Sequence, residues 1–180
     1  MITFKKVNLF LVLILVFVNI FCVAPCYSLT AREDLFKNAL DLSSVGKFNL
    51  ALKEWNRYLN AYPDDAAGLS NRGNVRLVIG DVEGSIDDQN KAISLNPNEI
   101  DPYINRGIAE EALGLWSQAK KDYLFVISRD SENFSAIYNL ANVEGSTSQW
   151  HKARDLFSKA AFYNPGFAMA RSSMALADYQ

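Results

Sequence analysis

The sequence is poor in the residues on which many catalytic and metal sites depend. Its 180 residues include one histidine, His151, and two cysteines, Cys22 and Cys26, which both lie near the N-terminus. A metal or thiol site needs several such residues at suitable spacing, and the single histidine has no second histidine to help it hold a metal. We therefore expect no catalytic residue, no metal site and no cofactor.

The chain also has little net charge. Its 18 lysines and arginines stand against 20 aspartates and glutamates, which gives a formal net charge of -2. Proteins that are drawn to nucleic acid or to an anionic membrane surface usually carry a basic excess. No basic stripe with interleaved aromatic residues and no glycine-rich phosphate loop occurs in the sequence. We therefore expect no nucleic-acid partner.

One long apolar run occurs, from Leu9 to Ala24, after a short basic start at Lys5 and Lys6. A basic start, an apolar stretch and small residues before Leu29 are typical of a secretory signal peptide. The run is also close to the ~20 residues of a membrane span, so an uncleaved anchor that contacts the membrane through residues 7–24 remains an alternative. Both interpretations make residues 1–28 a targeting segment. They predict an exported, extracytoplasmic location, in a periplasm or a lumen, for the domain at residues 29–180.

The remainder of the chain repeats itself every 34 residues. The residues that recur at this spacing include Gly46, Gly80 and Gly114, then Asn71, Asn105 and Asn139, and also Pro63 and Pro97. A fixed period of this length indicates a solenoid array of stacked units. The period divides the chain into units at residues 32–65, 66–99, 100–133 and 134–167.

Each unit has the pattern of two helices. Positions 4, 8 and 11 of a unit lie on one helix face, and so do positions 17, 20, 21, 24, 27 and 28. The small residues at positions 8 and 20 let the two helices approach closely. Glycine at position 15 is suited to the left-handed conformation that ends the first helix, and proline at position 32 ends the second. The pair Asp101-Pro102 predicts a helix start with Asp101 as the N-cap. Residues 168–180 are predicted to form a capping helix on the last unit.

These residues resemble the tetratricopeptide repeat. The stretch Asn71-Arg72-Gly73-Asn74, with Gly80-Asp81 and the run from Lys91 to Pro97, matches the pattern of that family closely, and the resemblance covers residues 32–167. It implies an all-α fold, an α-solenoid of four helix-turn-helix units plus the C-terminal capping helix. The chain is similar to short exported arrays of cyanobacteria and plastids. The departures from the family pattern are Gln89 at an apolar position, Ser131 in place of a proline and Ser148 in place of the turn glycine.

The resemblance also implies a groove. In this family the first helices line a concave surface, which positions 2, 5, 6, 9, 12 and 13 of each unit face. An amide both donates and accepts a hydrogen bond, so a row of asparagines can pair with the main chain of an extended peptide. The alternative is that these asparagines bridge neighbouring helices and that the apolar candidates pack within the array. The candidate partner-binding residues are Asn71, Asn74, Asn105, Asn139, Asn142, Tyr138, Phe36 and Ile104.

The predicted function is a non-enzymatic scaffold that binds a segment of a protein or peptide partner outside the cytoplasm. The alternative is a membrane-anchored assembly factor for a membrane protein complex such as a photosystem. A related version of the family holds a partner's C-terminal carboxylates with a lysine at position 5, where this chain has none. We therefore expect no recognition of chaperone tails, and the sequence leaves the partner's identity and the oligomeric state open.

Overall fold

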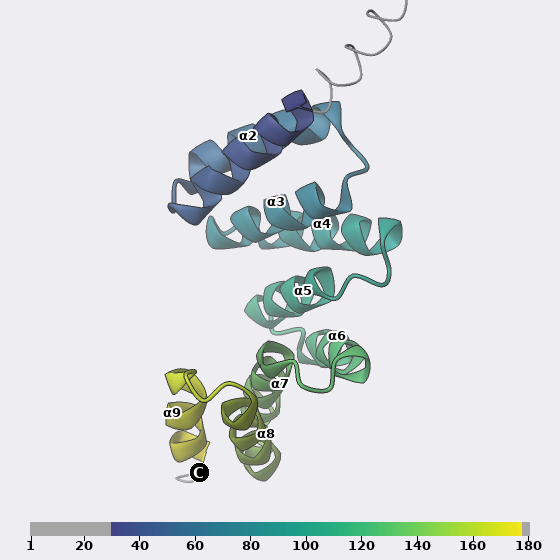
Figure 1. Ribbon diagram of the computed structural model, residues 1–180. Helices are drawn as coiled ribbons and strands as arrows, with labels where there is room; N and C mark the ends of the chain where they lie inside the picture. Colours follow the sequence, from purple (N-terminus) through teal and green to yellow (C-terminus); the bar gives the residue numbers. More distant parts are fainter. Residues whose placement is uncertain (1–29, 178–180) are drawn as a thin grey trace, which may run out of the picture.

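The computed structural model describes residues 30–177, and all regular structure in that range is helical. Nine helices follow one another there and no strand occurs between them. The helices are stacked as successive antiparallel pairs into a column that runs from the N-terminal to the C-terminal end (Figure 1). The prediction of an all-α solenoid is thereby confirmed.

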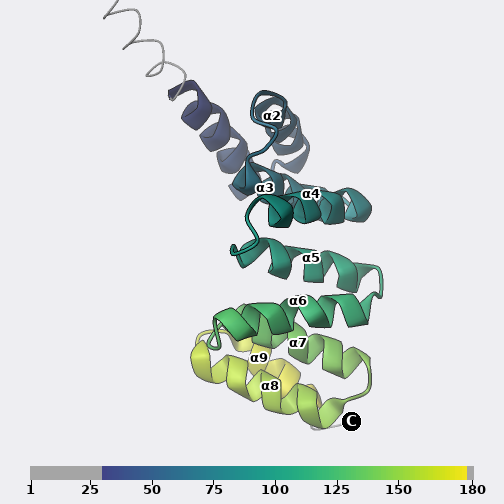
Figure 2. The ribbon, with the colours of Figure 1, turned by 90° about the vertical axis from the view of Figure 1, so that its right-hand side faces the viewer.

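Two helices fall within each 34-residue unit, and a ninth follows the last unit. The helices are residues 30–44, α2 (Phe48–Ala61), α3 (Ala66–Val78), α4 (Val82–Leu95), α5 (Asp101–Ala112), α6 (Trp116–Arg129), α7 (Phe134–Ser146), α8 (Trp150–Tyr163) and α9 (Ala168–Ala177). The first helices α3, α5 and α7 contact one another along the column as well as their own second helices. Figure 2 shows the same stack turned by 90°, with α5 lying between α4 and α6 down the column.

The turns between the two helices of a unit adopt the left-handed conformation. Gly46, Gly80 and Gly114 have φ of 75°, 89° and 70°. Ser148, which replaces glycine at the same position of the fourth unit, has φ of 62°. A side chain is disfavoured in this region, so at Ser148 the packing of the unit imposes the conformation that glycine adopts readily in the other three turns.

Small residues allow the two helices of a unit to lie close together. A Cβ atom built on Gly107 would lie 2.6 Å from Cε1 of Tyr123, and one built on Gly73 would lie 2.6 Å from Nε2 of Gln89. At the other side of the crossing, Ala119 is completely buried. The packing leaves no room for larger side chains at these positions.

The helices α3, α4 and α7 begin with a side-chain cap, whereas α2, α5, α6 and α8 have none. Asp65, Asp81 and Asn133 accept hydrogen bonds from the backbone N–H groups three residues further on, at 2.7, 3.1 and 3.0 Å. The N-cap of α5 is Ile100, so the prediction that Asp101 is the N-cap is wrong. The helix begins one residue earlier than expected, and the Asp101 carboxylate therefore caps nothing.

A repeated polar triad joins consecutive units. Arg72 on α3 makes a bidentate ion pair with Asp88 on α4, at 2.8 and 2.6 Å, and donates to Oδ1 of Asn56 on α2 at 3.0 Å. Each triad thus ties the two helices of one unit to the second helix of the preceding unit. The equivalent residues one period later repeat all three bonds, each at 2.7 Å, and are Asn90, Arg106 and Asp122.

One period further on, the same three positions are all leucine. Leu124, Leu140 and Leu156 replace the asparagine, arginine and aspartate. Leu140 is buried, and Leu156 packs against the cluster to which Leu140 belongs. The asparagine position is exposed in both forms, as Asn90 and as Leu124. The buried carboxylate and the guanidinium that pairs with it are replaced together, which leaves no buried charge without a partner, so the two solutions are physically interchangeable.

The last helix, α9, packs against α8 in the place that a further unit would occupy. Ala170 and Ala177 are its buried residues. None of the helices between residues 30 and 177 has the length and hydropathy that crossing a membrane requires. The predicted signal peptide or anchor at residues 1–28 lies outside the described residues.

Candidate partner-binding groove

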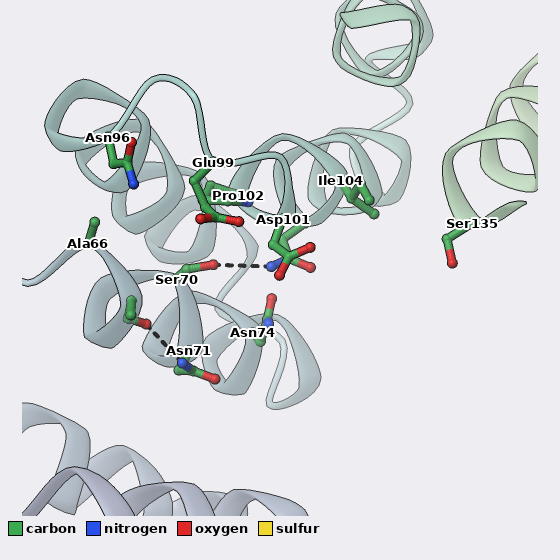
Figure 3. Close-up of a pocket in the computed structure, with 12 residues that line it drawn as sticks. Ala66, Ser70, Asn71, Asn74, Asn96, Glu99, Asp101, Pro102, Ile104 and Ser135 are labelled. Carbon is green, nitrogen blue, oxygen red and sulfur yellow. Dashed lines mark hydrogen bonds between the residues drawn. The ribbon is translucent and has the colours of Figure 1, made fainter. Parts of the chain in front are cut away.

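The first helices together line a hollow of about 560 Å³. Its wall is formed by α3 and α5, with Ser135 from α7 on the far side (Figure 3). Four of the eight predicted partner-binding residues lie around it, namely Asn71, Asn74, Ile104 and Asn105. The tertiary structure therefore brings residues from three different units to one surface.

The asparagines around this hollow differ in the hydrogen bonds that they form within the protein. Asn105 donates to the hydroxyl of Ser70 at 3.1 Å and thereby bridges α5 and α3. Asn71 donates to the carbonyl of Ala67 on its own helix at 2.9 Å. Asn74 accepts a long hydrogen bond of 3.4 Å from Gln89. Each amide still has one end without a partner among residues 30–177, so each retains capacity to bind a peptide group.

Asn139 and Asn142 lie further along the column on α7 and have no side-chain hydrogen bond within the described part of the chain. Asn142 lines a second hollow of about 380 Å³ between α7 and α9, which Glu111 of α5 and Ser173 of α9 also line. A segment that follows the first helices from α3 to α9 would meet both hollows.

The three apolar residues predicted to contact a partner also pack against other residues of the repeat domain. Phe36 packs edge-on against Trp55 and Tyr58, with ring centroids 5.0 and 5.3 Å apart. Tyr138 lies between Phe157 and Phe167, at 5.4 and 4.8 Å. Ile104 both packs against a core cluster and faces the hollow. Among these three, Ile104 is the residue most clearly shared between core and groove.

Gln89 explains one departure from the family pattern. It is completely buried and donates to the backbone carbonyl of Ser70 at 3.0 Å. Gly73 leaves the space that the Gln89 amide occupies. The Gln89 amide therefore fixes the backbone of Ser70, a residue that lines the hollow. The sequence showed Gln89 only as a polar residue at a usually apolar position of the repeat, and it did not indicate the bond to Ser70.

Two carboxylates and no cation line the same hollow. Glu99, in the loop before α5, and Asp101, in its first turn, both border it, and Figure 3 shows their carboxylates on the side of Ser70. Neither forms an ion pair with any residue that the structure describes. Sequence analysis missed both residues, because Asp101 was assigned to a cap and Glu99 lies outside the predicted helix.

A buried carboxylate with a raised pKa, Glu110, lies away from the groove, between α5 and α6. Glu110 is 8% exposed, and burial together with the negative charge of Asp122 raises its pKa to about 7. Arg106, 4.0 Å away, opposes this rise only partly, because its guanidinium is engaged by Asp122. Burial also raises the pKa of Glu111, which accepts a hydrogen bond from Tyr123.

In the part of the chain that the structure describes, no three histidine, cysteine, aspartate or glutamate residues are placed to hold a metal ion. His151 is exposed at the start of α8. The described residues thus offer a lined surface and hydrogen-bonding groups.

Comparison with known proteins agrees with this geometry. Residues 36–100 match the family described as tetratricopeptide repeat. Over that stretch the chain resembles tetratricopeptide repeat proteins. Tetratricopeptide repeat protein 6 of Homo sapiens is 28% identical over 128 residues, which are 69% of this chain and 24% of that protein. The chain spans between 11% and 56% of the length of the curated relatives it matches.

Solved structures share the fold. MamA from Desulfovibrio magneticus RS-1 superposes with a TM-score of 0.72 at 17% identity, over 82% of this chain and 84% of that one. The first tetratricopeptide domain of Spaghetti (RPAP3), bound to the HSP90 peptide SRMEEVD, has a TM-score of 0.62 at 25% identity, over 65% of this chain and 93% of that one. Proteins of this repeat family mediate protein–protein interaction.

Proposed function

We propose that this repeat protein is a non-enzymatic scaffold that binds an extended segment of a partner protein along its first helices. The observation that carries the proposal is the hollow shared by α3, α5 and α7, bordered by amides with unused hydrogen-bonding capacity. The main chain of an extended segment presents donors and acceptors at regular intervals, as the amides of the array do. A peptide bound to the tetratricopeptide domain of Spaghetti supports this mode of binding.

The groove amides can be tested without disturbing the packing between helices. Neither Asn71 nor Asn139 bonds to another helix among residues 30–177, so we expect the variant Asn71→Ala/Asn139→Ala to fold normally. The purified full chain is used to select binders from a random library of ten-residue peptides, and fluorescence anisotropy measures their affinity. Loss of two hydrogen bonds at about 1 kcal/mol each predicts roughly thirtyfold weaker binding by the variant.

The matched control for this test removes two amides from second helices. Asn60 on α2 and Gln118 on α6 are exposed and belong to no helix that lines the hollow. The variant Asn60→Ala/Gln118→Ala is expected to bind as the unchanged chain does. Equal affinity of the groove variant and this control, or a library that yields no binder, would contradict the proposed function.

We propose further that the repeat domain works outside the cytoplasm, in a periplasm or lumen. The support is the basic start and apolar run of residues 5–24. Retention of that run would make the protein a membrane-anchored factor that assists assembly of a membrane protein complex such as a photosystem.

N-terminal sequencing of the protein purified from its native compartment distinguishes the two forms. We expect the mature chain to begin near Leu29, because Cys26 and Ser28 supply the small residues that a signal peptidase requires. An intact N-terminus in a membrane fraction would favour the anchored assembly factor. An intact N-terminus in a cytoplasmic fraction would contradict both.

A further inference from the structure

We infer that the partner segment is basic, and that a lysine or arginine side chain of it enters the hollow between α3 and α5 with its cation at Glu99 and Asp101. This inference rests on the proposed function and specifies the chemistry of the partner. The hollow is acidic, and two of its polar groups, the Asp101 carboxylate and the Ser70 hydroxyl, have hydrogen-bonding capacity that no described residue fills.

The hollow carries negative charge and no positive charge. Among the groove positions of the second, third and fourth units, the only acidic or basic residues are Asp101 and Glu111. The hollow of about 560 Å³ adds Glu99, and none of the residues that line it is lysine, arginine or histidine. A segment with positive charge is attracted to such a surface, and an acidic segment is repelled.

The Asp101 carboxylate forms no hydrogen bond or ion pair with any residue between 30 and 177. Asp65, Asp81 and Asn133 stand at the starts of other helices and cap them with their side chains. Asp101 lies one residue inside α5 and makes no side-chain cap bond. Its charge is stabilised by the N-terminal end of the helix and remains available to a cation in the hollow.

The buried hydroxyl of Ser70 lies at the base of the hollow. Ser70 is 7% exposed and accepts a hydrogen bond from Asn105, but its own proton has no acceptor among the residues described. The Ser70 hydroxyl borders the hollow, and the backbone carbonyl of the same residue accepts a hydrogen bond from Gln89. It can donate to a carbonyl group of the incoming segment.

The shape of the site suits a long cationic side chain. Ala67, Pro102 and Ile104 provide apolar wall on the same hollow. The aliphatic part of lysine or arginine packs on such a wall while its charged end stays at the wet, acidic edge. The acidic peptide SRMEEVD of the Spaghetti complex lacks this complementarity.

The test uses the peptides selected from the random library with the purified full chain. We expect the selected sequences to be enriched in lysine and arginine. Each lysine of a selected peptide is then replaced by norleucine, which keeps the apolar stem and removes the charge. At low salt we expect the lysine peptide to bind about fivefold to tenfold more tightly than the norleucine analogue, and this difference to shrink as salt is added.

The variant Glu99→Gln/Asp101→Asn should abolish the difference between the two peptides while it still binds the norleucine analogue. The matched control, Asp87→Asn/Glu132→Gln, removes the same charge from residues that do not line the hollow, and should keep the difference. Selected peptides without basic residues, or a difference that survives in Glu99→Gln/Asp101→Asn, would overturn the inference. Binding that is still weakened by Asn71→Ala/Asn139→Ala would then leave the scaffold function standing.

Discussion

Replacing Arg106 with leucine is expected to lower the free energy of unfolding by about 3 kcal/mol, because it strands a buried carboxylate. Asp122 is 5% exposed and receives two hydrogen bonds of 2.7 Å from Arg106. Without that guanidinium its charge would face the carboxylate of Glu110, which is also buried. Thermal unfolding followed by circular dichroism should show a midpoint about 10 °C lower.

The chain itself supplies the control for this experiment. One period after Asn90, Arg106 and Asp122, the equivalent positions are occupied by three leucines. The triple variant Asn90→Leu/Arg106→Leu/Asp122→Leu removes the charge together with its partners, and we expect its stability to stay within about 1 kcal/mol of the original. If the single and triple variants lose equal stability, the loss comes from packing and the ion-pair explanation is wrong.

Glu110→Gln is expected to stabilise the protein above neutral pH and to have little effect in acid. The folded-state pKa of Glu110 is raised to about 7 from an ordinary value of 4.5, so the folded chain holds this proton more tightly than the unfolded chain does. The contribution of Glu110 to stability is therefore greatest below about pH 4.5 and is lost as the pH rises to about 7. A pKa difference of one between the folded and unfolded states corresponds to about 1.4 kcal/mol, so the rise from 4.5 to about 7 predicts that the variant gains about 3 kcal/mol at pH 8.

Urea unfolding of both proteins at pH 4.5 and pH 8 measures this effect. The control is Glu132→Gln, which makes the same chemical change at an exposed carboxylate. We expect the control to show no pH-dependent difference from the unchanged chain. A gain of equal size at both pH values would mean that the introduced glutamine stabilises the fold through packing or hydrogen bonding, and that the ionisation of Glu110 is not the cause.

The Glu110 site also shows how one repeat differs from the next. The equivalent residue of the preceding unit is Arg76, which pairs with Asp88 at 3.2 Å. In the third unit a carboxylate occupies the same place beside Asp122, so a favourable contact becomes a repulsive one. The array therefore tolerates opposite charges at one position of its repeat, at a cost in stability that depends on pH.

The sequence by itself determined the architecture. The 34-residue period, the small residues at the helix crossings and the glycines of the turns predicted the paired helices, and the left-handed turn even extends to Ser148. These features act over one turn of helix or one loop, where spacing along the chain fixes geometry. The predicted helix start at Asp101 failed by one residue, because a short polar residue before a proline fits either the cap or the first turn.

Only the tertiary structure decided what each side chain of the groove does. Asn105 reaches Ser70 across 35 residues, while Asn139, at the same position of the next unit, remains without a side-chain partner in the part of the chain described. Tyr138 is held between two rings from α8 and the loop that follows it. Such contacts depend on the distance between helices that cross in space, and that distance is set by the summed packing of many side chains. A repeat in the sequence marks equivalent positions, but the neighbours of those positions differ from unit to unit.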